Sequence, residues 1–109
     1  MLYISVEDFL SKSSGIRRLS RQEEKVLAQA MKNGSTDARE ALIRSYLPQV
    51  AANVRRCGPY SQSLSLVYEC LQALEKAVDS FDFSQDSETF AHRLSWWLRQ
   101  TTVRHIANR

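Results

Sequence analysis

The sequence contains few of the residues that interrupt helices or build covalent frameworks. Only three glycines and two prolines occur in 109 residues, which favours long helices and argues against an all-β fold. The two cysteines, Cys57 and Cys70, form no CxxC pair and have no flanking histidine. We interpret them as reduced cysteines at helix positions and expect no disulfide framework.

Membrane and secretion signals are also missing from the sequence. No apolar run approaches the roughly 18 to 20 residues of a membrane span. The first eight residues, MLYISVED, lack a basic segment followed by an apolar core, so we expect no secretion signal. A cytoplasmic protein without a membrane contact is the resulting expectation.

Arrangements that carry catalysis are equally absent. The sequence has no clustered carboxylate pair, glycine-rich phosphate loop, HExxH motif or Ser/His/Asp arrangement. His92 and His105 are expected to be solvated or at the core edge, and not metal ligands. We therefore predict no catalytic residue, no metal site and no cofactor, and an enzyme is a poor alternative.

The composition is that of an ordinary globular domain. Hydrophobic residues make up 43% and charged residues 25% of the chain, and the length fits one domain over residues 1–109. The net charge of +3 permits nucleic-acid binding but does not by itself argue for it. The position of the charge therefore matters more than its amount.

Helical periodicity runs through almost the whole chain. We expect helices at about 6–12, 21–32, 37–57, 64–81 and from 86 or 87 to near the end, which gives an all-α, compact bundle of about four to five helices. Ser20 and Glu23 form a capping box, and Asn33-Gly34 ends the helix that it opens. Pro48 predicts a kink or break. The expected inward residues are Val26, Leu27, Ala30 and Met31 in 21–32, Leu42, Tyr46, Leu47, Val50 and Val54 in 37–57, and Val67, Leu71, Leu74, Val78 and Phe81 in 64–81.

The last helix concentrates the basic character of the chain. We expect Asp86 and Glu88 in its first turn, beside the positive end of the helix dipole. From Phe90 onward there is no acid, whereas four arginines (Arg93, Arg99, Arg104 and Arg109) and both histidines are present. Spacing of 100° per residue predicts a packing side with Phe90, Leu94, Trp97, Thr101 and His105, and Leu98 at its edge. The opposite side holds His92, Trp96, Arg99, Gln100 and Val103.

This opposite side has the chemistry for contacts with nucleobases. Glutamine offers a donor and an acceptor to a base edge, arginine binds phosphate or guanine, and an exposed indole stacks on an unpaired base. The simpler interpretation is a solvated basic helix whose Trp96 packs on a neighbour. On this helix alone, the simpler interpretation is slightly favoured.

The order of several segments resembles the sigma-70 family of bacterial RNA polymerase sigma factors. Residues 66–82 read LVYECLQALEKAVDSFD, 95–100 read SWWLRQ and 106–108 read IAN; LSRQEE at 19–24 and AREALI at 38–43 precede them. These stretches are similar, in the same order and spacing, to region 2 of that family and to the region 1.2-like segment before it. The resemblance implies a sigma domain 2 fold, with region 1.2-like helices in 1–34 and polymerase-binding and minus-ten-binding helices in 35–109.

The resemblance also implies partners and site residues. The helix at 64–81 would dock on the coiled coil of the polymerase beta-prime subunit through Ser65, Tyr68, Glu69 and Gln72. The last helix would bind the minus-ten promoter element, chiefly its non-template strand, and begin melting by capturing a flipped base. The implied DNA-binding residues are Phe90, His92, Arg93, Trp96, Trp97, Arg99, Gln100, Val103 and Arg104. An anti-sigma factor is a further candidate partner, and no cofactor is implied.

Several positions depart from the family pattern. Arg93 stands where an aromatic ring usually stacks on the flipped base, and Val103 replaces a threonine that reads the first minus-ten base pair. Ala91 and His92 replace small hydroxyl residues, Ser65 and Tyr68 replace an acid and a glutamine, and the loop between Phe81 and Phe90 is one residue longer. These changes indicate a divergent, alternative sigma factor. No counterpart of the domain that reads the minus-35 element follows, which we interpret as an excised domain or one half of a split factor.

Two other functions fit part of the pattern. A degenerate sigma-like regulator that binds polymerase or another protein without melting DNA is favoured by Arg93 and Val103, whereas Trp96, Trp97 and Gln100 count against it. A generic helical interaction module with a helix-turn-helix-like grip on DNA explains the helices and the basic end, but not the ordered segments.

Overall fold

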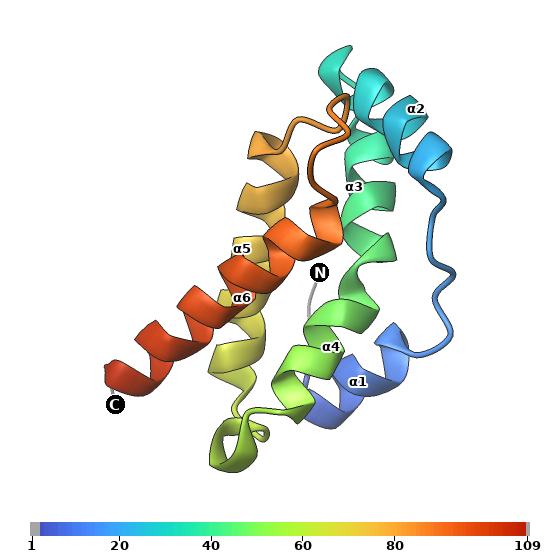
Figure 1. Ribbon diagram of the computed structural model, residues 1–109. Helices are drawn as coiled ribbons and strands as arrows, with labels where there is room; N and C mark the ends of the chain where they lie inside the picture. Colours follow the sequence, from blue (N-terminus) through green and yellow to red (C-terminus); the bar gives the residue numbers. More distant parts are fainter. Residues whose placement is uncertain (1–2, 109) are drawn as a thin grey trace.

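A computed structural model describes residues 3–108. Met1, Leu2 and Arg109, which was counted among the arginines of the last helix, lie outside the described residues. Within residues 3–108 there are six α-helices, one 3-10 turn and no strand, which confirms the expected all-α fold (Figure 1). The elements are α1 (Val6–Ser13), α2 (Arg21–Lys32), α3 (Thr36–Ser45), α4 (Leu47–Arg55), η1 (Gly58–Tyr60), α5 (Leu64–Ser80) and α6 (Phe90–Ala107).

Hydroxyl side chains determine where five of these helices begin. At each start, the oxygen of a serine or threonine accepts a hydrogen bond from the backbone N–H three residues on, which satisfies one of the unpaired donors of the first turn. The five capping residues are Ser5, Ser20, Ser35, Ser63 and Thr89. The capping box of Ser20 and Glu23 is present as predicted.

The start of α6 differs from the sequence-based expectation. Thr89 caps the helix and Phe90 is its first residue, so Asp86 and Glu88 lie in the preceding loop and the first turn of α6 contains no acid. The Thr89 cap therefore determines where α6 begins. Asp86 and Glu88 form ion pairs from the loop instead.

The predicted break near Pro48 is present and divides the expected helix at 37–57 into α3 and α4. Tyr46 ends α3 and precedes α4, and Pro48 is the second residue of α4. Proline has no N–H to donate to the preceding turn, but this loss costs nothing in the first turn of a new helix. The chain therefore restarts a helix at the position where it could not continue one.

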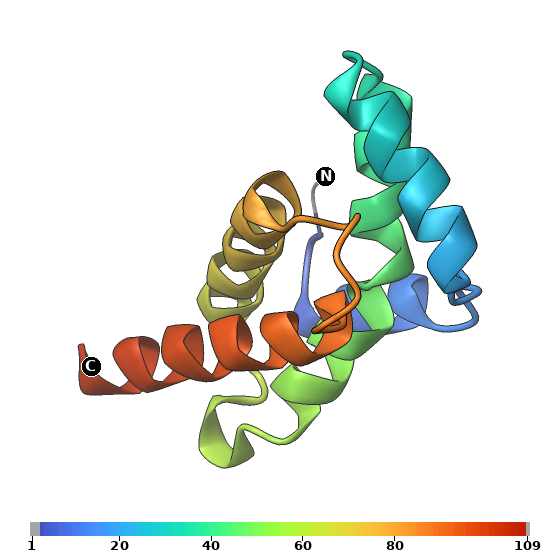
Figure 2. The same cartoon turned by 45° about the horizontal axis from the view of Figure 1, so that its top comes forward.

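The core lies where α5 packs against α6 on one side and against α3 and α4 on the other (Figures 1 and 2). Because α5 has neighbours on two sides, its buried surface is wider than the predicted stripe and includes Leu66, Cys70, Ala73 and Ala77. Leu71 and Phe81, which were expected inside, are half-buried. At the end of α5, an aromatic cluster joins the helices through Tyr46, Phe81, Phe83 and Phe90.

The prediction for α2 was partly wrong. Val26 was expected to face inward but is 59% exposed, whereas Leu27 and Met31 are partly buried against the core. The buried residue of α2 is Glu24, whose carboxylate accepts a hydrogen bond from the hydroxyl of Tyr46. Burial and the Glu24 carboxylate both raise the pKa of Tyr46, which keeps this donor protonated.

Within residues 3–108, no helix combines the length and the apolar character needed to cross a membrane.

Candidate nucleic-acid interface

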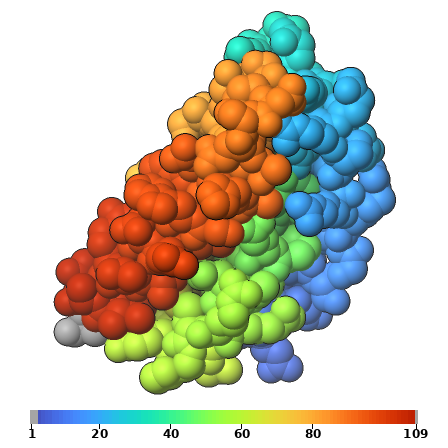
Figure 3. Space-filling model, in the orientation of Figure 1, coloured from blue at the N-terminus to red at the C-terminus, as the bar shows by residue number. Residues whose placement is uncertain are grey.

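Helix α6 has two sides of different character, as the sequence predicted. Leu94, Leu98, Thr101 and His105 are buried, and Trp97 is half-buried against the core. The opposite side, here called the outward stripe, consists of His92, Trp96, Arg99, Gln100 and Val103, all exposed. Trp96 is 52% and Val103 58% exposed, although both are large and apolar. Helix α6 runs across one face of the molecule (Figure 3).

Phe90 is a correction to the predicted DNA-binding set. It is only 1% exposed and packs on Tyr46, Phe81 and Phe83. A side chain so buried cannot contact a nucleobase in this conformation, so Phe90 is a core residue that anchors the start of α6. Spacing had already placed it on the packing side, and only the family resemblance suggested a DNA contact.

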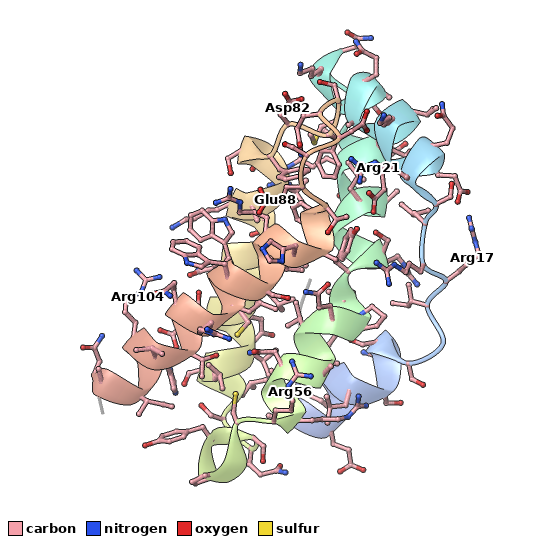
Figure 4. The ribbon with its side chains drawn as sticks, in the orientation of Figure 1. Arg17, Arg21, Arg56, Asp82, Glu88 and Arg104 are labelled. Carbon is pink, nitrogen blue, oxygen red and sulfur yellow. The ribbon has the colours of Figure 1, made fainter. Side chains whose placement is uncertain are left out.

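Arg93 lies at a pocket that the sequence did not reveal. A cavity of about 380 Å³ opens between the loop at 81–89 and the first turns of α6, and we call it the loop pocket. It is lined by Ser80, Phe81, Asp82, Gln85, Ser87, Glu88, Arg93 and Trp97. The guanidinium of Arg93 forms an ion pair with Glu88 at 2.8 Å. Trp97 and Phe81 form the apolar part of the pocket wall. Figure 4 labels Glu88 and Asp82 on this loop, above α6.

A second hollow borders the outward stripe on its other side. This groove of about 630 Å³ separates α4 from α6, and it contains Arg56, Cys57, Arg99, Val103 and Ile106. Gln49 donates to the Ala91 carbonyl and to Ser95, and Asn53 donates to Thr102, so α4 fixes the position of α6. Sequence reasoning missed these α4 residues, because their only signal was a polar side on a helix assigned to the core.

Two arginines of α6, Arg99 and Arg104, and Arg56 at the end of α4 form no ion pair with any described residue. Their charges are therefore available to a partner. Arg104 borders a third hollow of about 410 Å³ between α5 and α6, together with Glu69, Gln72 and Lys76. Exposed arginines without an ion-pair partner attract phosphate groups.

The residues predicted to dock on polymerase are brought together on α5, but Tyr68 and Glu69 already have partners on other segments of the chain, and Ser65 is hydrogen-bonded to Ser63. Ser65, Glu69 and Gln72 are exposed, whereas Tyr68 is half-buried. The Tyr68 hydroxyl accepts from the Tyr3 N–H at 2.6 Å and donates to the Tyr3 carbonyl at 3.0 Å. The Glu69 carboxylate is hydrogen-bonded to the ring of His105 on α6. His105 is therefore a core-edge residue, as expected.

The loop before α6 is held on α2 by charge. Asp86 contacts Arg21 at 3.1 Å and Lys25 at 2.9 Å, and Arg21 also donates to the Gln85 carbonyl. Lys25 and Arg21 lower the pKa of Asp86 below its ordinary value. Residues 3–108 contain no group of three or more His, Cys, Asp or Glu residues arranged to hold a metal ion.

Comparison with known proteins identifies relatives of this chain. No protein-family model matches the chain. RNA polymerase sigma factor SigA of Clostridium acetobutylicum is 34% identical over 110 residues, which cover 96% of this chain and 29% of that protein. RNA polymerase sigma factor SigA of Listeria monocytogenes is 31% identical over 104 residues, covering 94% of this chain and 28% of that protein. The chain thus spans less than a third of the length of these relatives.

Proposed function

The chain belongs to the sigma-70 family of RNA polymerase sigma factors, and from this premise we propose that it is a promoter-recognition domain that binds core polymerase and the minus-ten promoter element. The proposed role is binding, with no chemical step and no cofactor. On this proposal the protein acts in the cytoplasm. Residues 1–34 form a region 1.2-like part, and 35–109 contain the polymerase-binding and DNA-binding helices.

The observation that carries the proposal is the exposure of the outward stripe. An indole, an amide and a guanidinium lie on one solvent-facing side of a helix whose other side holds it in the core. In the proposed complex, Gln100 and Val103 read the first minus-ten base pair, Val103 through a thymine methyl group only. Trp96 and Trp97 lie at the junction between duplex and single strand, and Arg99 and Arg104 bind the DNA backbone. His92 and Arg93 lie at the side where the non-template strand separates.

Polymerase binding is proposed for the exposed side of α5. Ser65, Glu69 and Gln72 offer polar groups to the beta-prime coiled coil, and Tyr68 contributes the edge of its ring because Tyr3 occupies its hydroxyl. This surface and the outward stripe lie on adjacent helices. One domain can therefore contact polymerase and DNA at the same time. An anti-sigma factor would act by covering either surface.

The test uses the chain together with core polymerase from the same bacterium. We expect the chain to co-purify with core polymerase, and sequencing of the transcripts should reveal start sites that depend on it. Trp96→Ala and Gln100→Ala should impair transcription from those sites with little loss of helicity. If Trp96→Ala strongly lowered the stability of the fold while transcription from those sites persisted, the two sides of α6 would be wrongly assigned.

A degenerate sigma-like regulator is the second candidate, and two substitutions at the proposed DNA-binding positions favour it. Arg93 replaces the stacking ring, and Val103 replaces the threonine that reads the first minus-ten base pair. Such a protein would bind polymerase without opening DNA. A single-stranded minus-ten oligonucleotide at low salt separates the two, because stacking on the exposed indole should quench tryptophan fluorescence and absence of quenching would favour the regulator.

A further inference from the structure

We propose that Glu88 is a positioning residue that holds the guanidinium of Arg93 as the stacking platform for a base in the loop pocket. This inference rests on the proposed function and deepens it. The ion pair of Arg93 and Glu88 would take the role of the aromatic ring that usually stands at position 93. Glu88, in the loop before α6, would therefore contribute to the base-binding site.

The ion pair fixes the orientation of Arg93. Both Nε at 3.2 Å and Nη2 at 2.8 Å donate to the same carboxylate oxygen of Glu88. Two bonds from different nitrogens define the plane of the guanidinium, whereas one bond would leave it free to rotate. A planar cation held at the rim of a pocket offers a flat face to an aromatic ligand.

Glu88 is itself held by the loop. Its N–H donates to the Gln85 side-chain oxygen at 3.0 Å, and its carbonyl accepts from the Gln85 side-chain amide at 2.8 Å. Gln85 also accepts from the N–H and hydroxyl of Ser87. One amide side chain therefore fixes the backbone on both sides of the acid. Because Glu88 is already held in place, less entropy is lost on its side when it forms the ion pair with Arg93.

The other walls of the pocket suit a nucleobase. Trp97 and Phe81 are half-buried aromatic side chains, and the cavity of about 380 Å³ is wide enough to admit a single base. The pocket lies at the N-terminal end of α6, next to the outward stripe that would hold the adjoining duplex. A base that leaves the duplex beside Trp96 would enter a site with a cationic plane and two ring edges.

The experiment measures how much the base itself contributes to binding. Two fork-junction DNAs are compared with core polymerase and each variant, one with a base and one with an abasic site at the first unpaired non-template position. For the unsubstituted chain we expect the DNA with the base to bind about 5-fold more tightly. Arg93→Ala should reduce this ratio towards 1.

Two further substitutions separate the plane from the charge. Arg93→Lys keeps the charge and removes the plane, so the ratio should also fall towards 1. Arg93→Tyr keeps a plane and removes the charge, so the ratio should be retained or increase. Preservation of the ratio in Arg93→Lys would overturn the proposal, because it would show that Arg93 acts only as a charge.

Glu88→Gln tests the positioning role. Removal of an acid near DNA should strengthen binding of both DNAs, but the ratio between them should fall because the guanidinium is no longer fixed. Asp79→Asn is the matched control: it breaks the Arg39 ion pair on α5, outside the loop pocket, and should leave the ratio unchanged. A ratio unaffected by Glu88→Gln would overturn the positioning role.

The outcomes also separate this inference from the proposed function. A chain that binds both fork-junction DNAs equally would retain the proposed function and overturn the inference. A chain that binds neither DNA with core polymerase would overturn both. Thermal unfolding followed by circular dichroism confirms that each variant is folded, which is expected because Glu88 and Arg93 lie at the surface.

Discussion

Helices α2 and α6 both lie at the surface of the molecule, but different contacts hold them in place. Helix α6 packs through five buried residues, among them Leu94 and Leu98, and so its opposite side is free to carry Trp96 and Gln100. Helix α2 buries only Glu24, and its other attachments are partly buried apolar side chains and exposed ion pairs to Asp86.

In α6 the residues that stabilise the fold are different from the residues proposed to bind DNA. In α2 the contacts that hold the helix depend on pH and salt concentration. Apolar burial does not depend on protonation. Because α6 is held through its buried side, residues of the outward stripe can be changed without loss of the fold. Polar links depend on protonation and ionic strength. The attachment of α2, and of the loop that it holds, should therefore respond to the solution.

Leu98→Ala should lower the free energy of unfolding by about 2–5 kcal/mol, because it removes a buried side chain and leaves a cavity on the inward side of α6. Chemical denaturation followed by circular dichroism measures the change. Leu74→Ala on α5 should give a loss in the same range. A loss below about 1 kcal/mol in both variants would show that α6 is not held by its apolar side.

Tyr46→Phe should lower the free energy of unfolding by about 1.5–3 kcal/mol, because the buried Glu24 carboxylate loses its hydrogen-bond donor while the ring packing is kept. Urea unfolding provides the measurement. In the background of Glu24→Gln the same change should cost less, since no charge is then left without its donor. Equal costs in both backgrounds would contradict a link between α2 and Tyr46.

Acid should weaken the start of α2. The Arg17 side chain and the Ser20 backbone lower the pKa of Glu23 from its ordinary 4.5 to about 2. Because the folded-state pKa is the lower one, the stabilisation is fully present above about pH 4.5 and is lost as the pH falls towards 2. Urea midpoints measured across this range should fall less steeply in Glu23→Gln than in the unsubstituted chain. Identical slopes would rule out this contribution.

Trp96→Ala should change the free energy of unfolding by less than about 0.5 kcal/mol, because Trp96 is 52% exposed and its ring contacts that of Trp97 at the edge of the core. The same denaturation experiment measures this. Combined with the expected loss of fluorescence quenching by single-stranded DNA, a small change would confirm that the outward stripe contributes to binding and not to folding. A loss of stability in Trp96→Ala as large as that in Leu98→Ala would contradict the assignment of the two sides of α6.

Local sequence signals predicted the helices and the two sides of α6. The periodic apolar spacing, the capping box at Ser20 and the proline at 48 each act within a few residues, so they can be recognised without the fold. The boundary of α6 was wrong because acids near a helix start were weighed above a threonine cap. Val26 was misassigned because spacing alone cannot show that a polar pair, Glu24 and Tyr46, lies at the interface of α2.

Contacts between distant segments could not be predicted from spacing. The hydrogen bonds of Tyr68 with Tyr3 join residues that are 65 positions apart in the sequence. The pair of Arg93 and Glu88 spans only five residues, but it depends on the loop conformation before Thr89, which spacing does not give. The burial of Phe90 depends on three aromatic rings from different segments. The roles proposed for the site residues in DNA and polymerase binding remain predictions.

The two thiols differ in a way that makes the molecule easy to label at one place. Cys70 is fully buried, and burial raises the pKa of its thiol to about 12, so it should resist alkylation in the folded chain. Cys57 is half-buried at the end of α4 and borders the groove that contains Arg99. A maleimide dye should therefore attach at Cys57 alone, beside α6, where its emission would report the arrival of a ligand without any engineered cysteine.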